Sequence, residues 1–504
     1  MDAPAAAPAL GDIVRTILSS PWGSSLAFLN ALVITAGAVA LAMPGAITTN
    51  DLLLGMLLAA YLVVLWFRCV RHPKDLIEMD TMFLLFFGIY VVLPIVAMVM
   101  WQVFGDAPVF VDLVTHFDDA PLVTIAVAAL GAFILGYVSP LGRAVAGLMP
   151  HSDGTWRRSE GLAISGGLLV LGALLVGILV GSVGLETLTE SDYARGYEAT
   201  AGLGVLAGGV MLVQIGVVVL YLTMASPNRR APVLPLILFA LLALLMLRTG
   251  RRRVVLETGL ALLAAHHFYV RRVRFRTLAV AAAISLLVFS VVGLARSYLA
   301  EGLGGIVTRI TDEFGLGALV SMMSEPIAVL LALTETMYQV PGQESFWLGK
   351  SFVEAFELLV PLPLNPNRPL APSQWFVNLI DPVVARAGGG YSYALLAEGY
   401  LNFGIPGAVA VSFLEGVVVR GAVTYRSLFP SSKTRVLVYA VAMSLTVMMI
   451  RGDFATLLKA GIVSSLVPAV LTAVWLGRRK PHRTSVIDSS AGDMRVARPS
   501  IEYS

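Results

Sequence analysis

Four arginines near the end of one apolar stretch are the residues best suited to bind a ligand. They are Arg248, Arg251, Arg252 and Arg253. Guanidinium groups donate paired hydrogen bonds to phosphate oxygens, and each charge-assisted bond contributes about 1.5–3 kcal/mol. The spacing i, i+3, i+4 puts the first three on one face of a continuous helix, whereas a break at Gly250 would fan them around a turn. Either arrangement predicts a site for a pyrophosphate.

Two structural interpretations of the same cluster stay open. Arginines near the end of a membrane span can reach out to lipid headgroups. Glu257 lies one turn beyond Arg253 and could be its ion-pair partner. Against a purely structural role, an ionisable side chain inside a span is a functional residue by default.

A second candidate is a carboxylate that follows a run of glycines and tyrosines. Tyr391, Glu398 and Asn402 have the spacing i, i+7, i+11, which predicts one face of a short helix. Gly404 can stop this helix, and Pro406 can begin the next. Glu398 would then lie just outside the membrane, where a carboxylate could act as general base on a sugar hydroxyl. It could equally cap a helix or pair within the fold.

Two more arginines and several aromatic residues complete the candidate site. Arg195 and Arg451 could bind a second phosphate group, or they could form local ion pairs of little energetic value. Tyr391, Tyr393 and Trp375 have rings that could stack on sugars.

The composition excludes a soluble protein. Of the 504 residues, 57% are hydrophobic and 13% charged, and the mean hydropathy is +0.83, whereas a soluble domain carries roughly 25% charged residues. Long apolar runs without alternation predict an all-α helix bundle that crosses the membrane many times, and they exclude a β-barrel. A single cysteine, Cys69, excludes an intrachain disulfide and a cysteine metal cluster. We find no nucleotide-binding glycine loop.

At roughly 20 residues per crossing, we expect about 12 spans. They are 25–47, 52–68, 80–104, 121–140, 161–184, 204–225, 231–248, 254–270, 277–296, 405–423, 436–450 and 455–476. Basic residues follow every even-numbered span, so these loops and both termini are expected in the cytoplasm. The arginine cluster follows the seventh span and is therefore expected on the outer face, where strong positive charge needs an anionic partner.

The longest external segment is too long for a plain connector, so we expect it to be a folded cap. The expected divisions are a cytoplasmic N-terminus (1–24), spans one to nine (25–296), the external cap (297–402), spans ten to twelve (403–477) and a disordered cytoplasmic tail (478–504).

Three stretches of the sequence carry a resemblance to a known family. They are Ala397-Glu398-Gly399-Tyr400-Leu401-Asn402-Phe403-Gly404 after the glycine/aromatic run; Thr249-Gly250-Arg251-Arg252; and Val340-Pro341-Gly342 with Leu348-Gly349-Lys350-Ser351 and the prolines at 361 and 363. In these stretches the chain resembles the O-antigen polymerases, the oligosaccharide repeat-unit polymerases of bacterial surface polysaccharides. The likeness extends over about 185–455, and the plan of many spans with one long late external loop is also similar.

The resemblance implies an inverting, metal-independent glycosyltransferase of the membrane-embedded C type that uses no cofactor. It would transfer a growing glycan from undecaprenyl pyrophosphate onto a lipid-linked repeat unit, at the outer face of the bacterial inner membrane. The product would be O-antigen, capsule or exopolysaccharide. Implied partners are these lipid-linked oligosaccharides, membrane lipids, and a chain-length regulator and flippase of the same pathway. No nucleic acid is expected.

The mechanism that follows gives each candidate a role. The catalytic residues are Glu398, Arg251 and Arg252, and the substrate-binding residues are Arg248, Arg253, Arg195, Arg451, Tyr391, Tyr393, Asn402 and Trp375. Three alternatives remain: an O-antigen ligase, a lipid-linked oligosaccharide flippase, and a structural partner in an export complex. The large loop offers no clear histidine base for a ligase, and charge gathers at span ends rather than along a path for a flippase.

Overall fold

A computed structural model describes most of the chain. The described residues are 49–71, 76–104, 119–150, 154–184, 187, 203, 206, 208–249, 251–274, 277–278, 280, 316–361, 364–386, 391–428 and 432–478. Every regular element in this part of the chain is a helix, so the all-α prediction is confirmed. The expected first span (25–47), most of the ninth (277–296) and the tail from 479 lie outside the described residues.

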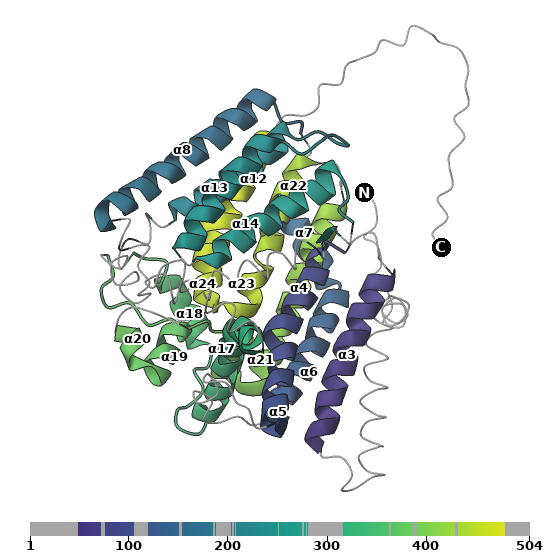
Figure 1. Ribbon diagram of the computed structural model, residues 1–504, viewed down its shortest axis with the longest axis vertical. Helices are drawn as coiled ribbons and strands as arrows, with labels where there is room; N and C mark the ends of the chain where they lie inside the picture. Colours follow the sequence, from purple (N-terminus) through teal and green to yellow (C-terminus); the bar gives the residue numbers. More distant parts are fainter. Residues whose placement is uncertain are drawn as a thin grey trace, which may run out of the picture.

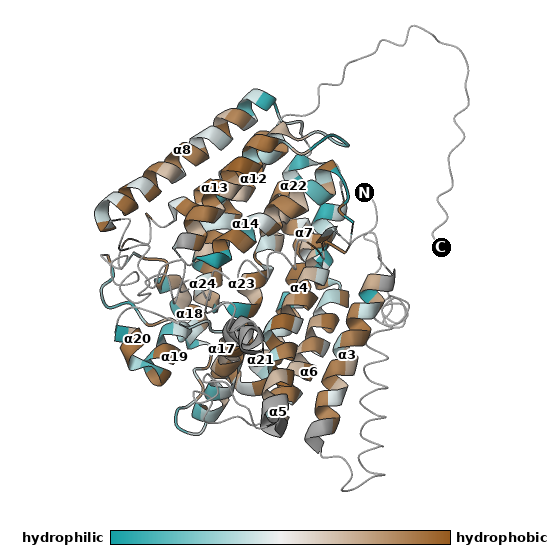
Figure 2. Cartoon of the chain, in the orientation of Figure 1, coloured by the Kyte–Doolittle hydropathy of each residue, from teal (hydrophilic) through white to brown (hydrophobic). Residues whose placement is uncertain are grey.

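Within the described ranges, seven helices are long and apolar enough to cross a membrane. They are Leu52–Cys69, Met79–Met98, Ala120–Val138, Arg158–Val183, Leu395–Ser427, Lys433–Arg451 and Phe454–Gly477. Two shorter apolar helices, Gly209–Met224 and Val233–Leu247, accompany them. The protein is therefore a multi-pass membrane protein. In Figure 2 the long helices are mainly hydrophobic, and hydrophilic residues gather at their ends and in the connections.

The helices of the first half are α3 (Thr49–Arg71), α4 (Met79–Phe87), η1 (Gly88–Val92), α5 (Leu93–Phe104), α6 (Asp119–Val138), α7 (Leu141–Leu148), α8 (Arg158–Val183), α12 (Gly209–Met224) and α13 (Val233–Arg248). Then come α14 (Arg252–Ala265), η3 (His266–Val270), α17 (Leu316–Gln339), α18 (Lys350–Glu357), α19 (Pro372–Ile380) and α20 (Pro382–Arg386). The last are α21 (Leu395–Ser427), α22 (Lys433–Ser444), α23 (Thr446–Arg451), α24 (Phe454–Thr456), η5 (Leu457–Leu466) and α25 (Val467–Gly477). Figure 1 shows α18, α19 and α20 gathered on the lower side of the molecule, whereas α7 and α22 lie on the upper side.

Glycines let α21 pack closely against α6. A Cβ atom at Gly136 of α6 would collide with the backbone carbonyl of Phe413, and one at Gly416 of α21 would collide with that of Phe133. Lipid gives membrane helices little hydrophobic reason to associate, so close backbone packing through small residues holds them together.

Helix α21 has a sharp bend near its start. Phe403 (φ −140°, ψ 16°) and Gly404 (φ 65°, ψ −150°) depart from helical geometry. The bend brings Gly399 against Gly407, so that a Cβ on either one would meet the backbone of the other. The segment from Leu395 to the bend is thus a short helix beside the start of the span, as predicted from Gly404.

Candidate functional site

The arginine cluster forms the turn between α13 and α14. Helix α13 ends at Arg248, and α14 begins at Arg252. The Thr249 hydroxyl donates to the Met246 carbonyl at 3.1 Å, and the Arg251 N–H donates to the same oxygen at 2.8 Å. These bonds satisfy a carbonyl that the helix end leaves open. The continuous-helix arrangement is therefore wrong, and the arginines fan around a turn.

This turn presents positive charge in two forms. The first backbone N–H groups of α14 have no helical partner, and the positive end of the helix dipole lies there. Arg251, Arg252 and Arg253 are all half-buried at the same place. In the described part of the chain, the Arg251 guanidinium makes no hydrogen bond or ion pair, which leaves its donors for a ligand. The side chain of Arg248 lies outside the described residues.

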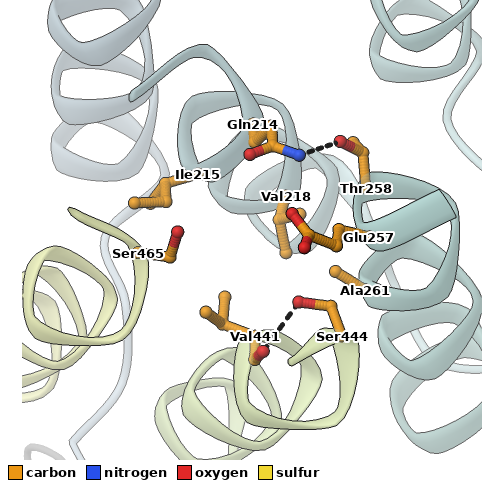
Figure 3. A pocket seen from close by; sticks show the side chains of 9 residues that line it. All are labelled: Gln214, Ile215, Val218, Glu257, Thr258, Ala261, Val441, Ser444 and Ser465. Atoms are coloured by element: carbon orange, nitrogen blue, oxygen red, sulfur yellow. Dashed lines mark hydrogen bonds between the residues drawn. The ribbon is translucent and has the colours of Figure 1, made fainter. Parts of the chain in front are cut away.

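Arg253 is held by a buried carboxylate. Its Nε lies 3.3 Å from Oε1 of Glu257, a side chain that is only 4% exposed. Figure 3 shows the Glu257 carboxylate directed into the space between α12, α14, α22 and η5. This cavity of about 20 Å³ also has Gln214, Thr258, Ser444 and Ser465 in its lining, and it can hold about one water molecule.

Arg451 connects this carboxylate to the cap. Among the described residues, the charges of Arg253 and Arg451 act on Glu257. Arg451 lies at the end of α23, and its Nη2 donates to the Ser392 hydroxyl at 3.0 Å. Ser392 lies in the extended segment that leads into α21. The α13–α14 turn, α23 and the start of α21 are thus neighbours.

Glu398 is completely buried in a hydrogen-bond network. The Ser351 hydroxyl donates to Oε1 at 2.6 Å, and the Phe454 N–H donates to Oε2 at 2.6 Å. The carboxylate therefore ties the start of α21 to α18 and α24. Of the two roles that the sequence leaves open, this geometry favours holding the fold over taking a proton from a substrate.

Asn402 completes the same network. Its Nδ2 donates to Ser351 Oγ at 2.7 Å and to the Glu398 carbonyl at 2.8 Å, and its Oδ1 accepts from the Gly349 N–H at 2.9 Å. The backbone N–H of Leu348 donates to the Asn402 carbonyl at 3.0 Å. Two of the three stretches that carry the family resemblance thus bind each other.

Asp453 joins a further element to this network. Its Oδ1 accepts from the Thr456 N–H at 2.7 Å and caps α24, and its Oδ2 accepts from the Ser373 N–H of α19 at 3.2 Å. Its negative charge also acts on Glu398. The two carboxylates together fasten α18, α19, α21 and α24 beside the arginines.

Comparison with a protein-family model shows which family this chain belongs to. The model of the O-antigen polysaccharide polymerase Wzy matches residues 192–479, which is more than half of the chain and includes both the arginine turn and the Glu398 network. The chain belongs to this family. It is a polysaccharide polymerase of the glycosyltransferase type that acts on lipid-linked oligosaccharide repeat units. No curated protein and no solved structure matches it.

The aromatic candidates of this Wzy-family protein differ in position. The predicted helical face is wrong for Tyr391, because α21 begins at Leu395 and Tyr391 lies in the extended segment before it. Its hydroxyl donates to Asp381 Oδ2 at 3.0 Å. Burial, and then this bond and the charge of Asp381, raise the pKa of Tyr391 to about 12, so the hydroxyl stays protonated.

The other two rings pack inward to different extents. Tyr393 is 1% exposed, and its hydroxyl lies 2.9 Å from that of Thr336. It therefore packs in the core and leaves no face open for a sugar in this conformation. Trp375 is half-buried and meets Trp347 edge to face, with ring centroids 5.5 Å apart. Arg195 lies outside the described residues.

The sequence reasoning missed two cations near α24. Lys459 is exposed on η5, inside the apolar span Phe454–Gly477, and the charge of Arg368 acts on it. Two like charges attract an anion. An ionisable residue within an apolar helix was the signal that could have identified Lys459.

Proposed function

We propose that this Wzy-family polymerase takes a growing glycan from undecaprenyl pyrophosphate. It transfers the glycan to a second lipid-linked repeat unit at the outer face of the bacterial inner membrane. One observation carries the proposal: Arg251, Arg252 and Arg253 lie together at the N-terminus of α14, where Arg253 pairs with Glu257 and Arg251 keeps its donors available. A pyrophosphate is the anion that this geometry suits.

The reaction is a displacement at the anomeric carbon with inversion. The acceptor hydroxyl oxygen forms the new glycosidic bond, the bond from the anomeric carbon to the pyrophosphate oxygen breaks, and the hydroxyl proton leaves to a base or to the departing pyrophosphate. Arg251 and Arg252 stabilise the charge that develops on the leaving group. In this proposal the two arginines take the place of the metal ion that other glycosyltransferases use to stabilise the leaving group.

The neighbouring residues place the two substrates. Arg248 holds the donor pyrophosphate together with Arg251 and Arg252. Arg451 and Arg195 bind the second pyrophosphate or complete the first site. Trp375 and Tyr391 border the acceptor sugars. Glu398 and Asn402 act as positioning residues, because their network holds α18 and α24 against the start of α21. A good leaving group lowers the demand on a base.

The proposed orientation rests on the basic residues that follow the even-numbered spans, which favour cytoplasmic loops and termini. A ligase would share the donor, but residues 297–402 contain no histidine that could serve as its base. A flippase would need charge along a path through the bundle.

The test uses purified protein, a synthetic polyprenyl-pyrophosphate repeat unit and EDTA, with chain length followed on a gel. Products that rise by one repeat unit at a time, without nucleotide or metal, support the proposal. Transfer only to an added lipid A–core acceptor would make the protein a ligase, and translocation in liposomes without new glycosidic bonds would make it a flippase.

A further inference from the structure

A second cationic hollow lies at the other end of α14. It has a volume of about 380 Å³, within the range of sites that bind small molecules. Its lining combines basic, aromatic and small polar residues: Asn228, His267, Phe268, Tyr269, Val270, Arg271, Arg272, Arg426 and Ser427. The polymerisation site described above uses none of them.

The hollow lies about one membrane thickness from the arginine turn. Arg271 follows the last residue of η3, and Ser427 is the last residue of the candidate span α21. The 14 residues of α14 and the 5 of η3 rise by roughly 28 Å, close to the thickness of the hydrocarbon core. With residues 254–270 as the expected eighth span, the two cationic regions belong to opposite faces of the membrane.

The charge of the hollow is positive and partly preorganised. Among the described residues that line it, none is acidic. Arg426 is held in place, because its Nη2 donates to Glu78 Oε1 and its guanidinium carbon lies 4.2 Å from the Phe268 ring centroid. Arg271 is exposed, and within the described residues its guanidinium makes no hydrogen bond or ion pair. A ligand with several anionic oxygens matches this arrangement.

The other polar groups of the lining are also donors. His267 Nδ1 accepts from the Val273 N–H at 3.0 Å, which holds the ring in the wall of the hollow. Tyr269 and Ser427 add hydroxyl groups, and Asn228 adds an amide. A phosphate group, which has oxygen acceptors on several sides, can use donors that converge in this way.

We propose that this hollow binds the phosphate headgroup of an anionic phospholipid. Basic pockets between membrane helices at the cytoplasmic interface are sites of this kind. A lipid fits the position, since the hollow opens where helices leave the membrane. Arginines at the end of a span could also contact headgroups without forming a site. That alternative does not account for a hollow with one guanidinium, that of Arg426, bonded to Glu78 and stacked on Phe268.

The experiment measures binding of phosphatidylglycerol and of phosphatidylcholine to the full chain in detergent, by native mass spectrometry. The double variant Arg271→Gln/Arg272→Gln should bind phosphatidylglycerol about thirtyfold more weakly, at about fivefold per charge. The matched control is Arg229→Gln/Arg230→Gln. Both control arginines are exposed in the loop after α12 and do not line the hollow. Exposed charges outside a site contribute little, so phosphatidylglycerol binding should change less than about threefold.

Three outcomes would overturn the assignment. Equal losses in the two double variants would mean that general surface charge binds the lipid. Equal affinity for both lipids would remove the anionic headgroup as the ligand. Displacement of phosphatidylglycerol by equimolar inorganic phosphate would make this a site for free phosphate. Because Arg271 is exposed, the single variant Arg271→Gln provides a check that does not depend on buried packing, and it should lose about fivefold.

Discussion

At the scale of single residues, the arginines of the site differ in whether another protein side chain holds them. Arg253 is fixed by Glu257, Arg451 is tied to Ser392, and Arg251 keeps its donors for a ligand. The sequence suggested the pairing of Glu257 with Arg253, but it did not show that Arg451 contacts Ser392 or that Arg251 keeps its donors. This difference allows the residues to be ranked by experiment.

Arg251→Ala should slow polymerisation more than it weakens folding. The change removes donors aimed at a developing charge, and loss of one such group lowers kcat by about 10²–10³-fold. The measurement is the rate of ladder formation at saturating lipid-linked substrate. Arg229→Ala is the matched control, since Arg229 is exposed in another loop. A normal ladder from Arg251→Ala would contradict the pyrophosphate role.

Glu398→Gln separates a positioning residue from a base. Glutamine can accept from the Phe454 N–H, but its amide would donate to the Ser351 hydroxyl, whose own proton then loses its acceptor. We therefore expect a loss of stability of no more than one hydrogen bond, about 0.5–1.5 kcal/mol, and less than about a tenfold loss of rate. Loss of a true base costs about 10²–10⁴-fold. Glu398→Ala should unfold more easily, because each buried group left without a partner costs about 1–3 kcal/mol. A large rate loss in Glu398→Gln with normal stability would restore the role of base.

Glu257→Gln should reduce the affinity for substrate by releasing Arg253. The variant keeps the volume of a side chain that is 4% exposed but removes the charge that faces Arg253 and Arg451. We expect KM for the lipid-linked donor to rise about tenfold, the equivalent of about 1.4 kcal/mol. Glu354→Gln breaks an ion pair of the same i,i+4 type with Lys350, in which the lysine is 60% and the glutamate 21% exposed. It should change KM little. An equal effect of both variants would refute a special role for Glu257.

At the scale of elements, helix ends were predictable and long-range partners were not. Thr249-Gly250 and Gly404-Ile405-Pro406 carry local signals for a break, and the structure breaks the helices at both places. Ser351 and Phe454 bind Glu398 from 47 and 56 residues away. The hydrophobic periodicity of a sequence does not show contacts between residues so far apart in the chain. The burial of Glu398 could therefore not be predicted from the sequence. The prediction that Tyr391 shares a helical face with Glu398 and Asn402 was wrong, because α21 starts four residues after Tyr391.

At the scale of elements, the bend of α21 is the feature that a substitution should disturb most. Gly404 has φ 65° and ψ −150°, and a Cβ atom there would lie 3.2 Å from the Phe346 ring. Gly404→Ala should therefore cost about 1–3 kcal/mol of stability, seen as a lower melting temperature in detergent. The control is Gly166→Ala in α8, where nothing lies within 4 Å and helix propensity predicts no loss. Equal melting temperatures for the two variants would mean that the bend is not strained by a side chain.

At the scale of the whole molecule, the proposed chemistry depends on which face of the membrane the cap occupies. The single native Cys69 can be replaced by serine, and cysteines can then be placed at two exposed positions, Val353→Cys in α18 and Arg274→Cys after η3. A membrane-impermeant maleimide should label Val353→Cys in intact spheroplasts and Arg274→Cys only after permeabilisation, because the basic segment that follows η3 should stay in the cytoplasm. The reverse pattern would put the arginine turn in the cytoplasm, where a donor already flipped outward cannot reach it. It would also move the proposed phospholipid site to the outer leaflet, so one labelling experiment tests the placement of both cationic regions.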